Sequence, residues 1–284
     1  MNATLTAVRA GALTTVQDAG RRGHAHLGVP RSGALDAPAM RLANRLAGND
    51  ADAAVLETTL TGCAVRPDRA VTVVVGGAPC PVTVDRRPVA WGAPVRVPAG
   101  AVLDVGAVTA GVRSYVAVCG GIAVEPVLGS RSTDLLSGLG PAPLRDGDVL
   151  PVGTPARPAP PVTAPWPGPP AELVLPVRYG PRADWFTAAA LHAFTSATYR
   201  VSPHSNRIGL RTEGPALQRA SAGELPSEGM VLGAVQVPPD GRPVVFLRDH
   251  PTTGGYPVIA VVTEPALAAA AQAAVGTPVR FTPA

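Results

Sequence analysis

The stretches Val71-Thr-Val-Val-Val75 and Val112-Arg-Ser-Tyr-Val-Ala-Val118 decide the fold, because each is a short run rich in β-branched residues. Two further runs of this kind, Val82–Val84 and Val95–Val97, lie between them, and Gly, Pro and Asp separate the runs. β-branched side chains favour strands, and the separating residues favour turns. The pattern predicts a compact antiparallel sheet or barrel from Ala54 to Val118.

The composition of the chain also indicates a mainly β protein. Of its 284 residues, 46% are hydrophobic, which is too apolar a composition for a disordered chain. The 31 glycines and 33 prolines interrupt the sequence too often for a helical bundle. Many short strands joined by turns are therefore expected, with a few short helices.

Three segments have the features of those helices. Asp36 precedes an apolar series that ends at Gly48, which predicts an N-capped amphipathic helix. Asp184–Phe194, with Asp184 available as its cap, and the alanine-rich segment Glu264–Ala274 are the other two.

A proline-rich segment divides the chain. Thr154–Pro170 contains eight prolines among seventeen residues, a composition that favours an extended segment without a core of its own. We therefore expect a first domain at 1–153, a linker at 154–170 and a second domain at 171–284, each domain long enough to bury a core. In the second half, Pro-Pro-Asp-Gly at 238–241 predicts a hairpin turn between two strands.

The chain contains no lysine, so all 24 basic residues are arginines. A phosphate-binding loop of the Walker type, a pyridoxal phosphate enzyme and a biotin carrier each require a lysine amine. The sequence excludes these three chemistries, and no biotin can be attached covalently to this chain.

Charge and hydropathy exclude further classes. The net charge of +4 comes from scattered arginines without a basic run, which argues against a nucleic-acid partner. Neither a leader pattern nor a run of about 18 apolar residues is present, so we expect a cytoplasmic protein with no membrane partner.

Cysteines and histidines give no sign of a metal site. Cys63, Cys80 and Cys119 are far apart and odd in number, and we expect them to be buried small apolar residues. His24 and His26 lack a third ligand at a recognisable spacing. No metal site is predicted.

The first candidate site lies in Gly11–Gly33, which has little hydrophobic periodicity and is predicted to be a long loop. It contains Gln17, Asp18 and Arg21, and Arg21 could bind a carboxylate bidentately while Asp18 orients it. The alternative is a surface ion pair on a solvated loop.

The second candidate site is Ser205–Arg211. Asn206, Arg207 and Arg211 could recognise a carboxylate or phosphate, and Gly209 permits a close approach of the backbone. The alternative is a turn whose arginines bind carbonyl groups or cover apolar surface.

The third candidate site is Arg248–Tyr256, which follows one predicted strand and leads into another. His250 could act as a general base and Thr252 and Thr253 as hydrogen-bond donors. The backbone amides of Gly254 and Gly255 could stabilise an oxyanion, with Tyr256 beside them. The alternative for His250 is a structural hydrogen bond.

Several motifs, found in order, resemble the family of the 5-oxoprolinase C subunit, also labelled allophanate hydrolase subunit 2 and grouped with biotin-dependent carboxyltransferase domains. The motifs are Gly11-Ala-Leu-Thr-Thr-Val-Gln-Asp-Ala-Gly-Arg-Arg-Gly23, Ser32-Gly-Ala-Leu-Asp36, Ala43-Asn-Arg-Leu-Ala-Gly-Asn49, Leu56-Glu57, Ser205-Asn-Arg-Ile-Gly209, Gly233-Ala-Val-Gln-Val-Pro238 and Thr252-Thr-Gly-Gly-Tyr-Pro257.

The resemblance implies a fold and an activity. The fold is mainly β, with two cyclophilin-like β-barrel domains. The activity is the ATP-dependent opening of 5-oxo-L-proline, a lactam, to L-glutamate, performed with partner subunits B and A that share ATP and magnesium with this chain. The sequence departs from the family at Asn206, where some relatives have an acidic residue, and at His250-Pro251, which replaces a more usual polar pair.

Two other functions are compatible with the resemblance. The chain could be the carboxyltransferase component of a biotin-dependent urea or amide carboxylase. It could also be a non-catalytic regulatory protein whose partner is a protein that inhibits a kinase. The label allophanate hydrolase does not fit, because amidase chemistry uses a lysine that this chain lacks.

Overall fold

In the first half of the chain, the strands that read as continuous apolar runs are buried on both faces. The computed structural model describes residues 3–155, 157–160, 162–221, 223 and 225–284. In β5 (Val71–Gly77), Val73 and Val75 enter one apolar cluster and Val74 enters another on the opposite face. Since successive side chains of a strand alternate between faces, a strand covered on both sides needs no polar alternation.

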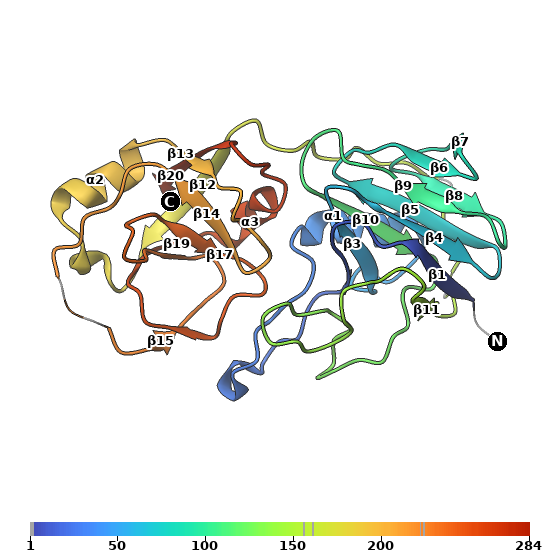
Figure 1. Cartoon of the computed structure of the whole chain (residues 1–284), viewed down its shortest axis with the longest axis horizontal. Helices are drawn as coiled ribbons and strands as arrows, with labels where there is room; N and C mark the ends of the chain where they lie inside the picture. The colour runs from blue at the N-terminus through green and yellow to red at the C-terminus, as the bar shows by residue number, and fades with distance from the viewer. Residues whose placement is uncertain (1–2, 156, 161, 222, 224) are drawn as a thin grey trace. The chain divides into compact units, whose positions relative to one another are not determined.

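Two sheets enclose the main core of this half (Figure 1). One has the order β11 (Val149–Pro151), β1 (Thr4–Arg9), β4 (Cys63–Pro67), β9 (Leu103–Val105), β6 (Val82–Val84), β7 (Arg87–Pro88). The other has the order β2 (Thr14–Gln17), β3 (Val55–Thr59), β10 (Arg113–Val118), β5, β8 (Pro94–Val97).

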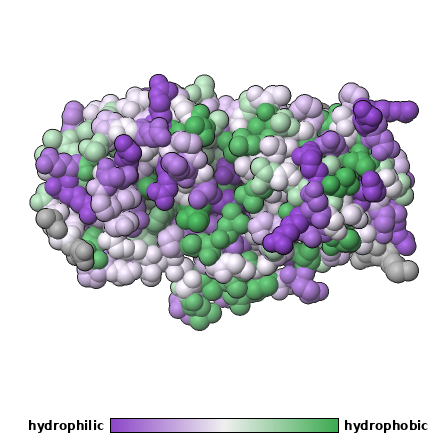
Figure 2. Space-filling model, in the orientation of Figure 1, coloured by the Kyte–Doolittle hydropathy of each residue, from purple (hydrophilic) through white to green (hydrophobic). Residues whose placement is uncertain are grey.

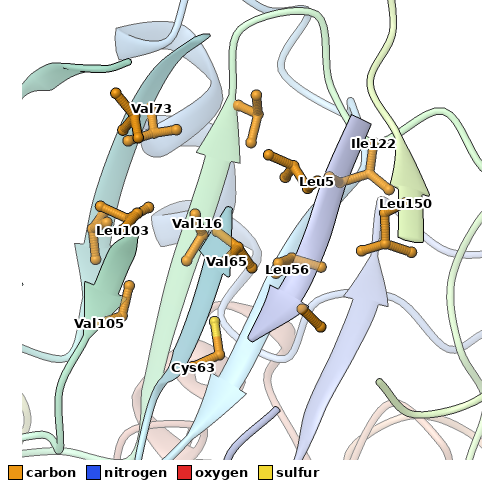
Figure 3. Close-up of a cluster of buried hydrophobic side chains, with 14 of the residues drawn as sticks. Leu5, Leu56, Cys63, Val65, Val73, Leu103, Val105, Val116, Ile122 and Leu150 are labelled. Atoms are coloured by element: carbon orange, nitrogen blue, oxygen red, sulfur yellow. The ribbon is translucent and has the colours of Figure 1, made fainter. Parts of the chain in front are cut away.

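The core between the two sheets consists of aliphatic side chains from both. Leu5, Val65 and Leu103 come from one sheet, and Leu56 and Val116 come from the other (Figure 3). Full burial of such a side chain stabilises the fold by about 1.5–3 kcal/mol. This core positions the strand ends that carry the polar residues described below.

Helix α1 (Ala37–Leu46) covers the outer face of the second sheet. Its residues Met40 and Ala43 are buried with Val74 and Tyr115. The side chain of Asp36 caps the helix by accepting a hydrogen bond from the Ala39 amide at 3.0 Å.

The second half of the chain forms a closed barrel. Its strand order is β12 (Leu173–Tyr179), β19 (Val258–Val262), β16 (Ala234–Gln236), β17 (Val244–Phe246), β14 (Gly209–Glu213), β13 (Tyr199–Val201), β20 (Pro278–Pro283). β12 and β20 run parallel and close the barrel, and the other neighbours are antiparallel. A closed barrel has no unpaired edge strand.

Short elements surround the barrel. They are the helices α2 (Ala188–Ser196) and α3 (Glu264–Ala270), the 3-10 helix η2 (Ala183–Trp185), and a separate sheet of β15 (Glu228–Gly229) and β18 (Thr253–Gly254). A further 3-10 helix, η1 (Ala25–Leu27), lies within residues 22–31, which group with this half of the chain. Phe194 of α2 stacks on Phe281 of β20, with ring centroids 4.5 Å apart.

The chain divides into two compact units. Unit 1 is built from residues 1–21, 32–134 and 138–169, and unit 2 from residues 22–31, 135–137 and 170–284, as far as these are described. Residues 156 and 161 of the predicted linker lie outside the described residues. Trp166, in the same segment, donates from Nε1 to the Gly92 carbonyl at 3.1 Å and lies over Gly76. The predicted domain boundaries at 153 and 171 stay a prediction.

The structure confirms the mainly β fold with few short helices, the helix capped by Asp36, the hairpin between β16 and β17, and the burial of the three cysteines. Among the described helices, none combines the length and hydropathy of a membrane-spanning segment. Hydrophobic and hydrophilic residues are interspersed on the face shown in Figure 2.

Two predicted details are wrong. The segment Gly11–Gly33 is not a loop throughout, because Thr14–Gln17 forms β2 and pairs with β3. The second helix begins later than predicted and is capped by Thr187, which accepts from the Ala190 amide, whereas Asp184 lies in η2. Thr187 has the extended backbone that an N-cap needs, with φ −66° and ψ 155°.

Candidate functional site

Arg207 lies inside unit 2, where its guanidinium binds Asp249. Nε and Nη2 donate to Oδ2 and Oδ1 at 2.9 and 3.0 Å, and the two side chains are 1% and 0% exposed. The Asp249 amide donates to the Arg207 carbonyl at 3.1 Å, and the Leu135 amide donates to Asp249 Oδ2 at 3.2 Å. This bidentate pair engages one edge of the guanidinium and fixes the chain after β17 to the turn before β14.

His250 follows this aspartate and is held in one orientation. Its ring stacks on Phe246, with centroids 5.8 Å apart and planes inclined by 8°. Nδ1 lies 2.7 Å from the Pro251 carbonyl oxygen. A carbonyl oxygen can only accept, so in the neutral ring Nδ1 holds the proton and Nε2 holds the lone pair. A general base that acts through Nε2 requires this tautomer.

Of the two predicted threonines, Thr253 lies in the small two-stranded sheet and Thr252 lies directly before it. Thr253 of β18 is paired with Gly229 of β15, and the Met230 amide donates to the Thr252 carbonyl at 2.8 Å. Arg182 forms an ion pair with Glu228, which lies opposite Gly254. The Thr253 side chain is exposed. The sheet presents a hydroxyl donor at the surface of unit 2.

Gly254, Gly255 and Tyr256 complete this loop. Gln236 is buried behind it and donates from Nε2 to the Tyr256 carbonyl at 3.1 Å. A Cβ at Gly254 would lie 2.8 Å from that nitrogen, so the backbone passes Gln236 too closely for a side chain. Gly255 and the 45% exposed Tyr256 line a cavity of about 590 Å³ together with Trp185, Arg219, Gly223, Leu225, Pro239 and Pro257.

Asn206 and Arg211 lie elsewhere on unit 2. Asn206 Oδ1 accepts hydrogen bonds from the Ile208 and Gly209 amides at 2.8 and 3.1 Å and shapes the turn before β14. Arg211 is exposed on β14. Both residues line a second cavity of about 510 Å³, so Arg207 and Arg211 do not converge on one ligand site.

In unit 1, Asp18 is a structural acceptor for the loop that contains Ser130, Arg131 and Ser132. Its Oδ1 accepts from the hydroxyls of Ser130 and Ser132 at 2.6 Å each and from the Gly20 amide at 2.8 Å, and Oδ2 accepts from the Arg131 amide at 2.6 Å. Four donors directed at one carboxylate explain its burial without a ligand.

Gln17 and Arg21 contact the same loop. Gln17 Nε2 donates to the Thr133 carbonyl at 3.0 Å. Arg21 donates from Nη1 to Ser32 Oγ at 3.1 Å and from Nη2 to the Ser132 carbonyl, and it is 2% exposed. These contacts make the alternative prediction, an ion pair on a solvated loop, wrong for Arg21, because burial requires its donors to be satisfied by protein groups.

Glu57 and Tyr115 form a buried polar group in unit 1 that sequence reasoning did not assign to a site. Glu57 Oε2 accepts from the Tyr115 hydroxyl and from the Leu35 amide, at 2.9 Å each, and Arg113 Nε lies 3.7 Å from Oε1. Burial, followed by the Glu57 charge, raises the pKa of Tyr115 well above its usual value. The available signal was the presence of Glu57, Arg113 and Tyr115 in strands that also contain the apolar residues Val55, Leu56 and Val116–Val118.

The structure therefore brings together part of the predicted site. Arg207, His250 and Thr252 are connected in unit 2 through Asp249 and the chain that follows it. Asp249 was inside the third motif, but its role as the partner of Arg207 was missed. Within the described residues, no group of three or more His, Cys, Asp or Glu side chains could hold a metal ion.

The class defined here is a mainly β chain of two units, one of them a closed barrel, with buried polar pairs in both units. Residues 27–283 match the family described as carboxyltransferase domain, subdomain A and B. The chain belongs to this carboxyltransferase-domain family.

Sequence relatives fall into two groups. The chain is 40% identical to the 5-oxoprolinase C subunit of Escherichia coli, over 98% of this chain and 90% of that protein. It is 31% identical to the 5-oxoprolinase C subunit of Haemophilus influenzae, over 94% and 87% of the two chains. It is also 34% identical to the urea amidolyase of Lachancea kluyveri over 96% of this chain, but spans only 16% of that protein.

Solved structures have the same fold over almost the whole chain. The crystal structure of TTHA0988 is 37% identical, with a TM-score of 0.89, and the alignment covers 99% of this chain and 56% of that one. The urea carboxylase of Kluyveromyces lactis is 32% identical, with a TM-score of 0.90, over 99% of this chain and 27% of that one. This chain thus corresponds to one part of each of these longer proteins.

Proposed function

We propose that the chain is a component of an ATP-dependent 5-oxoprolinase that opens 5-oxo-L-proline to L-glutamate together with subunits A and B. The observation that carries this proposal is the 40% identity to a 5-oxoprolinase C subunit, with 90% of that protein covered. The urea amidolyases are less similar, and only 16% of their length is matched.

The proposed chemistry assigns roles to residues of unit 2. His250 is the general base, acting through Nε2 because Nδ1 faces the Pro251 carbonyl at 2.7 Å. Thr252 and Thr253, with the amides of Gly254 and Gly255, stabilise the charge that develops on the lactam oxygen. Asn206 and Arg211 line a different cavity from Gly255 and Tyr256, so they are proposed to bind a carboxylate at a separate site on unit 2, whereas the Nε and Nη2 donors of Arg207 bind Asp249.

ATP with magnesium is the proposed co-substrate and activates the lactam carbonyl. The chain has no lysine for a phosphate-binding loop, so the proposal assigns ATP binding to the complex with subunits A and B. Gln17, Asp18 and Arg21 are proposed to support binding indirectly, by fixing the loop that contains Ser132.

The test is ATP-dependent release of glutamate from 5-oxo-L-proline by this chain mixed with its cognate subunits A and B, with each of the three chains omitted in turn. Release that disappears without this chain is the expected result. A folded, complete mixture that releases no glutamate would sink the proposal.

The likeness to the Kluyveromyces lactis urea carboxylase, with a TM-score of 0.90, favours one second candidate. In that case the chain accepts a carboxyl group from biotin on another chain and transfers it to an amide nitrogen. Carboxylation of urea or an amide after addition of a biotinylated carrier, a biotin carboxylase, bicarbonate and ATP, without glutamate release, would select this function.

A further inference from the structure

A cavity of about 510 Å³ on the unit 2 barrel is lined by two positive and two negative side chains. These are Arg211 and Glu213 of β14 and Asp240 and Arg242 of the turn before β17. Within the part of the chain that the structure describes, none of the four takes part in a salt bridge. Opposite charges therefore share one cavity without neutralising one another by direct contact.

The strands hold these charges in place. Arg211 and Glu213 are two residues apart on β14 and face the same side, outside the barrel. Val244 pairs with Arg211, so the turn that contains Arg242 lies along the same face. Glu213 Oε1 accepts from Ser202 Oγ at 3.0 Å, and Asp240 Oδ1 accepts from the Arg242 amide at 3.1 Å. Each carboxylate is thus oriented through one oxygen.

We propose that this cavity binds an open-chain amino acid with two carboxylates and one ammonium group, the charge pattern of L-glutamate. The inference rests on the proposed function and names the ring-opened product as the ligand. Guanidinium groups bind carboxylates through paired hydrogen bonds, which assigns Arg211 and Arg242 to the two carboxylates. Glu213 and Asp240 then accept the ammonium group.

The chemistry of ring opening explains why such a site distinguishes product from substrate. Water adds across the lactam C–N bond: the carbonyl carbon gains the hydroxyl and the nitrogen gains the hydrogen. At neutral pH the products of this step are a carboxylate and an ammonium group. Substrate and product both have a net charge of −1, so net charge does not distinguish them, whereas a site with separated charges of both signs does.

Size and charge favour this ligand over a nucleotide. Small-molecule sites commonly have volumes of about 300–1,000 Å³. The two carboxylates in the cavity would repel the phosphates of ATP and offset the attraction of the two guanidinium groups. A ligand with charges of both signs has no such conflict.

The test is isothermal titration calorimetry on the full chain at low ionic strength, where exposed charges are least screened. The probes are L-glutamate, glutarate, which lacks the ammonium group, and 5-oxo-L-proline. We expect glutamate to bind up to about fivefold more tightly than either of the others, which is the largest factor that one ion pair at a surface supplies.

Three variants and one control localise the binding. Arg242→Gln, Glu213→Gln and Asp240→Asn each remove one charge and preserve shape, and each should weaken glutamate binding by up to about fivefold. Arg178→Gln removes an exposed guanidinium from β12, outside the cavity, and should leave binding unchanged. Thermal unfolding checks that each variant is folded.

Equal binding of the three probes, or glutamate binding that folded Arg242→Gln and Glu213→Gln variants retain in full, would overturn the inference. Turnover by the complete mixture combined with no glutamate binding would overturn it too, while the proposed function stands. Glutamate binding that follows the expected pattern in a chain without turnover supports the site and rejects the proposed function.

Discussion

The Arg207 guanidinium and the Asp249 carboxylate form a bidentate ion pair with hydrogen bonds of 2.9 and 3.0 Å and almost no solvent exposure. The two residues are separated by 42 positions and meet because β14 and β17 are neighbours in the barrel. His250 follows this pair directly, so the orientation of the proposed base depends on it.

Removal of one partner of this pair should destabilise unit 2 strongly. Asp249→Ala leaves a buried guanidinium without its carboxylate, which costs about 3–5 kcal/mol. Urea unfolding should show this loss, whereas the exposed control Arg178→Gln should stay within about 0.5 kcal/mol of the parent chain. A loss below about 1 kcal/mol for Asp249→Ala would show that the pair contributes little to the fold.

Asp18 should behave as a structural residue. Its carboxylate accepts four hydrogen bonds, and Asp18→Ala leaves the donors of the Ser130–Ser132 loop unpaired, at a cost of about 3 kcal/mol. The exposed variant Asp184→Ala serves as the control. If Asp18 contacted substrate directly, Asp18→Ala would raise KM in the reconstituted enzyme while the free energy of unfolding stayed near the parent value.

The strands of the first half could be predicted because their apolar composition indicates that they are buried. β5 and β10 have buried residues on both faces, and such strands form continuous apolar runs. β2 could not be recognised in the same way. Its sequence Thr-Thr-Val-Gln is mostly polar, and its burial depends on partners such as the Ala10 carbonyl, which accepts from Thr14 Oγ1 at 2.7 Å.

The candidate site was predictable only as separate motifs. The polar residues around His250 stand out after a strand, but no spacing in the sequence relates Asp249 to Arg207, because the register of β14 and β17 brings them together. Arg207 and Arg211 are divided between a buried pair and an exposed cavity because Arg207 lies in the turn before β14 whereas Arg211 lies on the exposed face of β14, and this distinction requires the strand boundaries.

Cys63 should be unreactive in the folded chain and should make stability depend on alkaline pH. Burial raises its thiol pKa from 9.0 to about 12. Because the thiol pKa is higher in the folded chain than in the unfolded chain, the stabilisation that the protonated thiol contributes to folding is complete below pH 9.0. This stabilisation is lost as the pH rises toward 12. We expect no reaction of native Cys63 with a thiol reagent at pH 8, and full reaction in urea.

The pH dependence can be isolated with one substitution. Cys63→Ala removes the thiol, so its free energy of unfolding should decline less than that of the parent chain between about pH 9 and 11. Identical slopes in the two chains would contradict the raised pKa of Cys63. Mass spectrometry of the labelled peptides separates Cys63 from Cys80 and Cys119.

The loop from Thr252 to Tyr256 can be tested with a pair of glycine substitutions on opposite strands of one small sheet. In Gly254→Ala the new Cβ would lie 2.8 Å from Gln236 Nε2, so Gln236 must move and loosen its hydrogen bond to the Tyr256 carbonyl. Loss of that bond costs about 1 kcal/mol of stability. A displacement of about 1 Å at a catalytic loop can lower turnover by about 100-fold, so ATP-dependent glutamate release should fall by a much larger factor than the loss of about 1 kcal/mol in stability implies.

Gly229→Ala is the matched control, because Gly229 pairs with Thr253 and no atom lies within 4 Å of the added Cβ. Equal glutamate release by the two variants in the complete mixture would remove this loop from the proposed site.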